Sequence, residues 1–119
     1  MPSKNPTVST LTAFAKAINE AGASLGRDLS IRQLHTLIVT AAAGERGIDV
    51  TQLAQATGSS SAAISRNVRV LGAHHYDRAK GDGLGLLAIE LDQMDNRRRI
   101  ARPTPKGLEV MASILSHMT

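Results

Sequence analysis

The hydrophobic positions of the N-terminal half recur at the spacing of amphipathic helices. Residues 8–25 place Leu11, Phe14 and Ile18 three or four positions apart, which predicts a first helix over this range. Ser30 and the glutamine three residues later form the pattern of a capping box and predict the start of a second helix. The expected buried face of that helix is aliphatic: Ile31, Leu34, Leu37, Ile38 and Ala41.

Two shorter helices are predicted next, joined by a tight glycine turn. Asp49 and Gln52 repeat the capping-box pattern, and the helix that they begin ends at Gly58. Ser60 caps the following helix, which continues to about Gly72. The buried face of this second helix is expected to hold Ile64, Val68 and Leu71.

The pattern changes from helices to turns and strands after residue 72. Residues 73–85 are rich in glycine and polar side chains, which predicts a flexible loop. Leu86–Leu91 is a short apolar run typical of a strand, and Asp92–Asn96 is turn-like. Arg99–Arg102 predicts the returning strand, which Pro103 is expected to stop.

The last predicted helix begins at Thr104, with Pro105 at its first position, where proline is favoured. Its apolar stripe is expected to hold Leu108, Met111, Leu115 and Met118, with Val110 and Ile114 beside it. Apolar stripes on the first and last helices, beyond what one core needs, indicate a partner chain. We therefore expect a homodimer that shares helices 8–25 and 105–118; the alternative is that both stripes pack within one monomer.

The order of these elements is helix, helix, short helix, helix, hairpin, helix. It predicts a single domain over 1–119, mainly α with a small β-hairpin wing, which is a winged helix-turn-helix. The helix-turn-helix is expected at 49–72 and the wing at 86–102.

Composition excludes several classes of function. Aromatic residues make up 2% of the chain, which disfavours proteins that read single strands or RNA by stacking bases on aromatic rings. The absence of cysteine excludes disulfides and thiolate metal sites. No apolar run approaches the ~18 residues of a membrane span, and the N-terminus lacks a signal-peptide pattern, so we expect a cytoplasmic protein.

The positive charge is concentrated in one segment. The net charge is +4, and residues 59–106 carry nine positive and five negative side chains. A basic segment of this kind usually faces an anionic polymer, although a merely solvated surface is the alternative.

Helical geometry assigns an outward face to the helix after Gly58. With Ile64 buried, Ser59, Ala62, Arg66 and Arg69 point outward, and Ser61, Ala63 and Ser65 lie at the flanks. Small residues allow close approach to base edges, and arginine can bind guanine through two hydrogen bonds, so this face is expected to enter the major groove. No acidic residue occurs between Asp49 and Asp77, whereas an ordinary solvated helix face normally carries glutamate.

Three arginines, Arg97, Arg98 and Arg99, follow the turn at Asp92–Asn96. An arginine at a wing tip can enter a narrow minor groove, and Asp95 is expected to brace Arg97 through an ion pair. The alternative is a solvated run of charge.

Several of these motifs together resemble the MarR family of winged-helix transcription regulators. They are Asp49-Val-Thr-Gln-Leu-Ala with Gly58, the Ser60…Ile64-Ser65-Arg66…Leu71 helix, Asp92…Asp95-Asn-Arg97-Arg98, and Thr104-Pro105-Lys106-Gly107. The last two are the more specific. The similarity covers about Leu29 to Leu115, and the segment 73–85 is longer than the corresponding link in the family.

The resemblance implies a dimeric regulator, expected to be a repressor, that binds a pseudo-palindromic operator in double-stranded DNA. By position it places Ser60, Ser61, Ala62, Ser65 and Arg66 at the groove and makes Arg97 the wing arginine. The predicted DNA-binding residues are thus Ser59, Ser60, Ser61, Ala62, Ser65, Arg66, Arg69, Arg97, Arg98 and Arg99. Members of the family often release DNA on binding a small anionic or phenolic molecule, but the residues themselves do not indicate such an effector.

Two other binding functions stay open. The first is a protein-interaction module, in which the same face binds another protein instead of DNA. The second is an architectural or replication accessory protein that binds DNA with little sequence preference. No nucleophile–base constellation is present, so we expect no enzymatic activity and no cofactor. His74, His75 and Asp77 are too weak a pattern to predict a metal site.

Overall fold

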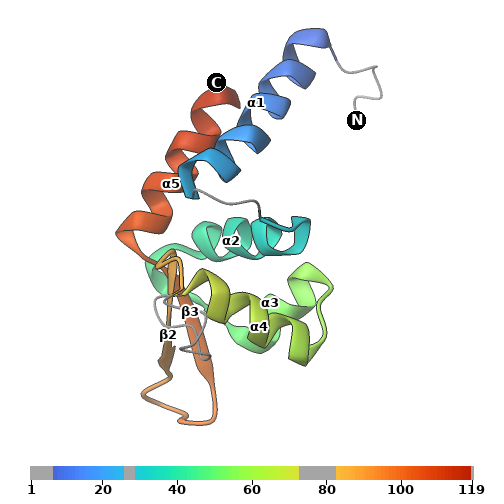
Figure 1. Ribbon diagram of the computed structural model, residues 1–119. Helices are drawn as coiled ribbons and strands as arrows, with labels where there is room; N and C mark the ends of the chain where they lie inside the picture. The colour runs from blue at the N-terminus through green and yellow to red at the C-terminus, as the bar shows by residue number, and fades with distance from the viewer. Residues whose placement is uncertain (1–6, 26–28, 73–82, 119) are drawn as a thin grey trace.

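The computed structural model describes residues 7–25, 29–72 and 83–118 and shows a body of helices with a small sheet at one edge (Figure 1). Most of the predicted 73–85 loop, with His74, His75 and Asp77, lies outside these residues. The helices and strands are α1 (Val8–Leu25), α2 (Ile31–Ala43), η1 (Gly44–Arg46), β1 (Ile48–Asp49), α3 (Val50–Thr57), α4 (Ser61–Leu71), β2 (Leu87–Leu91), β3 (Arg99–Pro103), α5 (Pro105–Leu115) and η3 (Ser116–Met118).

Most helix starts are the predicted ones because the capping side chains act locally. Ser30 Oγ accepts from the Gln33 backbone N–H at 3.0 Å, and Gln33 Oε1 accepts from the Ser30 N–H at 3.1 Å, which confirms the first capping box. Asp49 caps α3 by accepting from the Thr51 N–H at 2.7 Å. The predicted box with Gln52 is wrong: the Asp49 side chain accepts from the Thr51 N–H, and the reciprocal bond from the Gln52 side chain is not formed. The second carboxylate oxygen of Asp49 accepts from Arg98 of the hairpin.

The β structure is a three-stranded sheet and not a hairpin alone. Its order is β1-β3-β2, with both pairs antiparallel, and Ile48 and Asp49 pair with Ala101 and Ile100. The prediction missed β1 because a strand of two residues has no periodicity to detect. The short strand matters because it attaches the β2–β3 hairpin, which we call the wing, to the start of α3.

The wing continues one residue further than predicted. Pro103 was expected to stop the returning strand, but it belongs to β3 and pairs with Leu87. The register of β1 ends at Ala101, so Pro103 lies beyond that strand and its missing N–H leaves no ladder partner unsatisfied.

The core lies between α2, α3, α4, the sheet and α5. Its fully buried aliphatic side chains are Leu37, Leu53, Leu71, Leu86 and Leu87. The prediction that Ile31 and Ile38 of α2 are buried is wrong: Ile31 is 89% exposed, and Ile38 is also exposed. The expected stripe of the last helix divides: Met111 is buried together with Val110 and Ile114, whereas Leu108 and Leu115 of α5 and Met118 of η3 are exposed.

The Thr104–Gly107 motif joins the wing to α5. Thr104 Oγ1 donates to the Gly85 carbonyl at 2.6 Å and accepts from the Gly107 N–H at 3.0 Å. Lys106 Nζ donates to the Leu84 carbonyl at 2.9 Å. A Cβ at Gly107 would lie 2.0 Å from the Leu86 carbonyl oxygen, so only glycine allows this close approach of helix and strand.

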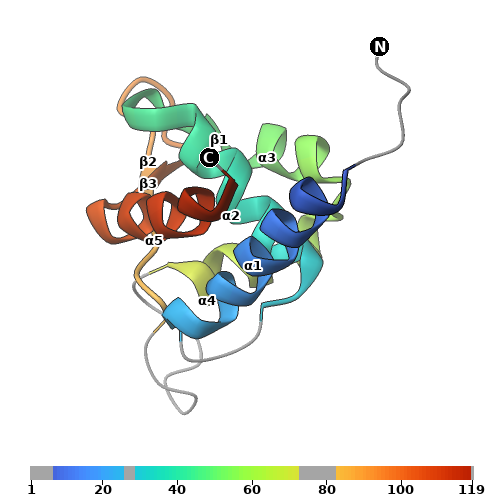
Figure 2. The ribbon, with the colours of Figure 1, turned by 90° about the horizontal axis from the view of Figure 1, so that it is seen from above.

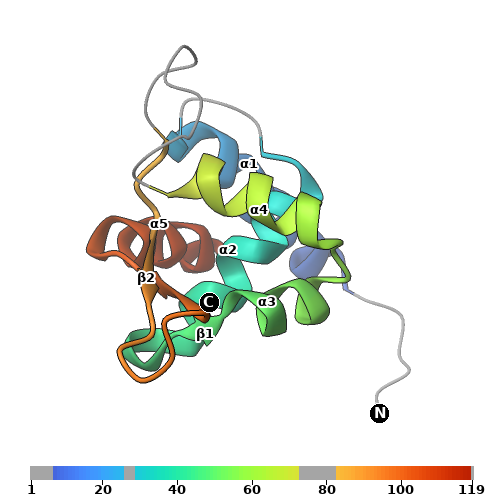
Figure 3. The same ribbon diagram turned by 90° about the horizontal axis from the view of Figure 1, so that it is seen from below.

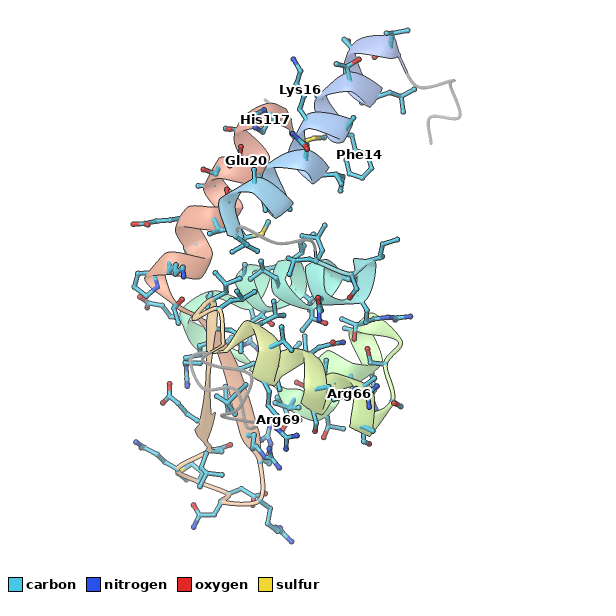
Figure 4. All side chains as sticks on the ribbon, viewed as in Figure 1. Phe14, Lys16, Glu20, Arg66, Arg69 and His117 are labelled. Atoms are coloured by element: carbon cyan, nitrogen blue, oxygen red, sulfur yellow. The ribbon has the colours of Figure 1, made fainter. Side chains whose placement is uncertain are left out.

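The molecule has two ends of different character. Helices α1 and α5 lie side by side and project from one side of the body, as Figures 1 and 2 show. Glu20 of α1 and His117 of η3 face one another at 3.4 Å (Figure 4). The wing extends in the opposite direction, and seen from below it lies in front with α3 and α4 (Figure 3). None of the helices described is long and apolar enough to cross a bilayer.

Candidate nucleic-acid interface

A tight turn orients α4 relative to α3. Gly58 ends α3 in the left-handed conformation at φ 67°, which glycine adopts without steric cost. The Thr57 hydroxyl donates to the Leu53 carbonyl at 2.9 Å and lies 2.8 Å from the Ser59 hydroxyl. Ser60 then caps α4 by accepting from the Ala63 N–H at 3.1 Å.

The exposed face of α4 contains most of the residues predicted for it. Ser61, Ala62 and Arg66 are exposed, and Ser65 and Arg69 are half-buried. Arg66 and Arg69 both leave the side of α4 that faces away from α2 (Figure 4). Their place on this face follows from the burial of Ile64, Val68 and Leu71 on the other.

Two of the predicted serines hold the turn in place. The Ser59 side chain is half-buried and bonded to Thr57, and the Ser60 hydroxyl is used as the helix cap. A capping hydroxyl retains a lone pair, so Ser60 stays available to a second partner.

The arginines of the wing are held differently from one another. The side chain of Arg97 is 90% exposed, and its Nε lies 3.2 Å from Asp95 Oδ1, as predicted. Arg98 points back to the body: its Nε donates to Asp49 Oδ2 at 2.8 Å, and its Nη1 lies 3.5 Å from Asp92 Oδ2. Arg99 begins β3 and is exposed.

The Asp49–Arg98 ion pair connects the wing to the helix-turn-helix. Asp49 is buried, and the hydrogen bond from Arg98 is the main reason that the pKa of its carboxyl group lies below the ordinary value. The N–H groups at the start of α3 lower this pKa as well. One carboxylate therefore caps α3 and anchors the wing.

A cleft of about 240 Å³ lies between α3, α4 and the wing. Its polar lining residues are Asp49, Thr51, Ser61, Ser65, Arg97, Arg98 and Arg99, and the carboxylate of Asp49 is paired with Arg98. The fold thus brings five of the predicted site residues to one concave surface, while Ala62 and Arg66 lie elsewhere on α4. Hydroxyls and guanidinium groups on such a surface suit phosphate oxygens.

Solved structures with the same architecture are regulators. The MepR–DNA complex of S. aureus matches with 19% identity and a TM-score of 0.67, over 90% of this chain and 77% of that one. MarR matches with 22% identity and a TM-score of 0.61, over 91% and 69%. The fold is that of MarR-type winged-helix regulators.

Another structure with the MarR-type fold is PcaV of Streptomyces coelicolor, solved with its natural ligand. It matches with 20% identity and a TM-score of 0.59, over 99% of this chain and 78% of that one. The sequence matches no protein-family model and no curated protein.

One basic residue beside the MarR-type helix-turn-helix was missed from the sequence. Arg32 is exposed in the first turn of α2, and its Nη1 would lie 3.1 Å from a Cβ placed at Gly58. A cation at a helix N-terminus opposes the helix dipole, and this local cost was the signal that could have singled Arg32 out. Tertiary packing places its guanidinium next to the α3–α4 turn.

The described part of the chain contains no cluster of three or more histidine, aspartate or glutamate side chains that could hold a metal ion.

Proposed function

We propose that this chain is a transcription regulator, acting as a repressor, that binds double-stranded DNA sequence-specifically as a homodimer. Helix α4 enters the major groove, and residues 92–99 of the wing reach the adjacent minor groove. The observation that carries the proposal is the cleft in which Ser61 and Ser65 of α4 face the wing arginines. A duplex lying across it would present a phosphate strand between the two grooves.

The two parts of this surface have different energetic roles. Guanidinium contacts to phosphate supply affinity that falls as salt rises, because counterions are released on binding. Arg66, together with the small side chains of Ser61 and Ala62, is placed to contact base edges, and each good base contact discriminates by about 1–3 kcal/mol. Arg32 adds a phosphate contact beside the turn.

Exposed apolar side chains at the opposite end support the homodimer. Leu11, Phe14 and Ile18 are exposed on α1, and Leu108 and Leu115 are exposed on α5. Figure 4 shows Phe14 on the side of α1 that faces away from α5, so the contact between these two helices does not cover it. A second copy would bury both stripes and would set two α4 helices at a fixed spacing.

Selection from a randomised duplex pool, followed by titration at two salt concentrations, tests the proposal. Duplex from upstream of the protein's own gene is included in the pool. A selected duplex is expected to bind at least about a hundredfold more tightly than random duplex, with affinity falling steeply as salt rises. Absence of binding to any duplex at low salt would refute DNA binding and direct the search to a protein partner.

The small side chains of the α4 face favour one alternative, an accessory protein of low sequence specificity. Ser61 and Ala62 offer fewer base contacts than longer polar side chains would. Equal affinities for the selected and the random duplex would support this alternative.

A further inference from the structure

The tip of the wing is a turn with a well-defined backbone. The Asp92 N–H donates to the Arg98 carbonyl at 2.9 Å, and the Arg98 N–H donates to the Asp95 carbonyl at 2.9 Å. Two aspartate side chains add to these contacts: Asp92 Oδ1 accepts from the Met94 N–H at 2.9 Å, and Asp95 Oδ1 accepts from the Arg97 N–H at 3.0 Å. The backbone at residue 94, and with it the Cα–Cβ bond of that residue, is therefore held in a fixed direction.

That side chain is apolar and almost fully exposed. Met94 is 93% exposed, at a position where polar residues are usual, and Leu91 beside it in the hairpin is 61% exposed. The described core does not use Met94, so packing within the monomer does not explain an apolar side chain at this place.

The same turn carries an exposed cationic group, Arg97, three residues after Met94. The side chain of Arg97 is 90% exposed, and Asp95 braces its guanidinium. Both aspartates of the tip are paired with arginines, so they present less negative charge to an approaching anion. The tip thus combines an apolar wedge with a guanidinium, as do proteins that insert side chains into the minor groove.

We propose that Met94 is a wedge that enters the minor groove beside Arg97, partly unstacks one base step and bends the duplex. This inference rests on the proposed function and deepens it. It predicts a preference for a flexible pyrimidine–purine step where the wing contacts DNA, at a position that no hydrogen bond reads. A membrane is a poorer partner for the wing tip than DNA, because one methionine between charged residues buries little apolar surface in lipid.

The test uses the full-length protein and the duplex selected above, with 2-aminopurine placed at successive steps. Wild-type protein is expected to raise the fluorescence at one step outside the region protected by α4, because unstacking relieves quenching. Replacing that step by a stiff A-tract step should weaken binding about fivefold. Met94→Leu should retain both effects, and Met94→Gln, of similar length but polar, should lose them.

Gln93→Ala is the matched control in the same turn and should behave as wild type. All these variants retain the backbone N–H of residue 94, which donates to Asp92 Oδ1, so the turn is expected to persist. A selected duplex that stays stacked at every step, or equal unstacking by wild type and Met94→Gln, would overturn the wedge alone. Failure of the wild-type protein to select any duplex would overturn the proposed function together with the wedge.

Discussion

Asp49 performs two tasks, and substitutions can separate them. It caps α3 through the Thr51 N–H and anchors the wing through Arg98. Asp49→Ser keeps an oxygen that can cap the helix but is too short to reach Arg98. Asp49→Ala loses both contacts.

The expected magnitudes follow from this geometry. Loss of an N-cap costs about 1 kcal/mol, so Asp49→Ala should be less stable than Asp49→Ser by that amount. In a domain of this size, this difference lowers the melting temperature by about 4 °C. Thermal unfolding followed by circular dichroism measures it.

The ion pair is tested by a double-mutant cycle on the stability of Asp49→Ser, Arg98→Ala and the double variant. The single changes should be non-additive, because either one removes the same contact. Additive free energies of unfolding would refute the claim that this pair anchors the wing. Both single variants should also bind duplex DNA more weakly than wild type, because the wing loses its attachment to α3.

The pH dependence provides an independent measurement. The pKa of Asp49 is lowered in the folded protein, so its charge contributes stability above the unfolded value of about 3.9. That contribution is lost as the pH falls through the lower folded pKa. The stability advantage of wild type over Asp49→Ser should therefore shrink as the pH falls below about 4, and an advantage that does not change with pH in this range would contradict this account.

Substitution of Arg66 on α4 and of Arg97 on the wing should affect DNA binding in two different ways when tested by titration. Arg66→Ala should reduce specific binding more than random binding, by about 1–3 kcal/mol, and an equal loss on both would exclude base reading. Arg97→Ala should weaken binding to all sequences and reduce the salt slope by about one, and an unchanged slope would count against wing contact. Gly107→Ala should destabilise the fold by about 1–3 kcal/mol in denaturant unfolding, because its Cβ meets the Leu86 carbonyl. Phe14→Glu should give monomers in sedimentation velocity, whereas Lys16→Glu on another side of α1 should not; a dimer that survives Phe14→Glu would place the interface elsewhere.

Local signals predicted the helices well. Caps act within four residues and the helical repeat is read within a few turns, so the starts of α2, α4 and α5 agree with Ser30, Ser60 and Thr104. The box predicted at Asp49 was wrong, because only half of it, the cap on the Thr51 N–H, is formed. The second partner of Asp49, Arg98, lies 49 residues away in sequence, where local spacing carries no information.

For helix α5, the hydrophobic periodicity of the sequence does not predict which side of the helix is buried. The helix is apolar on two sides, and the sequence grouped Leu108, Met111, Leu115 and Met118 in one stripe without deciding which of them the core would bury. The structure buries Val110 and Ile114, because the neighbouring sheet and α2 decide which side meets the core. The exposed side is the one that we assign to a second copy.

The sequence by itself determined the succession of helices, the α3–α4 turn, the outward face of α4 and the charge of the wing, because each depends on neighbours in the chain. Only the tertiary structure decided the existence of β1, the partner of Arg98, the position of Arg32 beside Gly58 and the cleft between α4 and the wing. These features are contacts between residues far apart in sequence, and packing of the whole domain selects them.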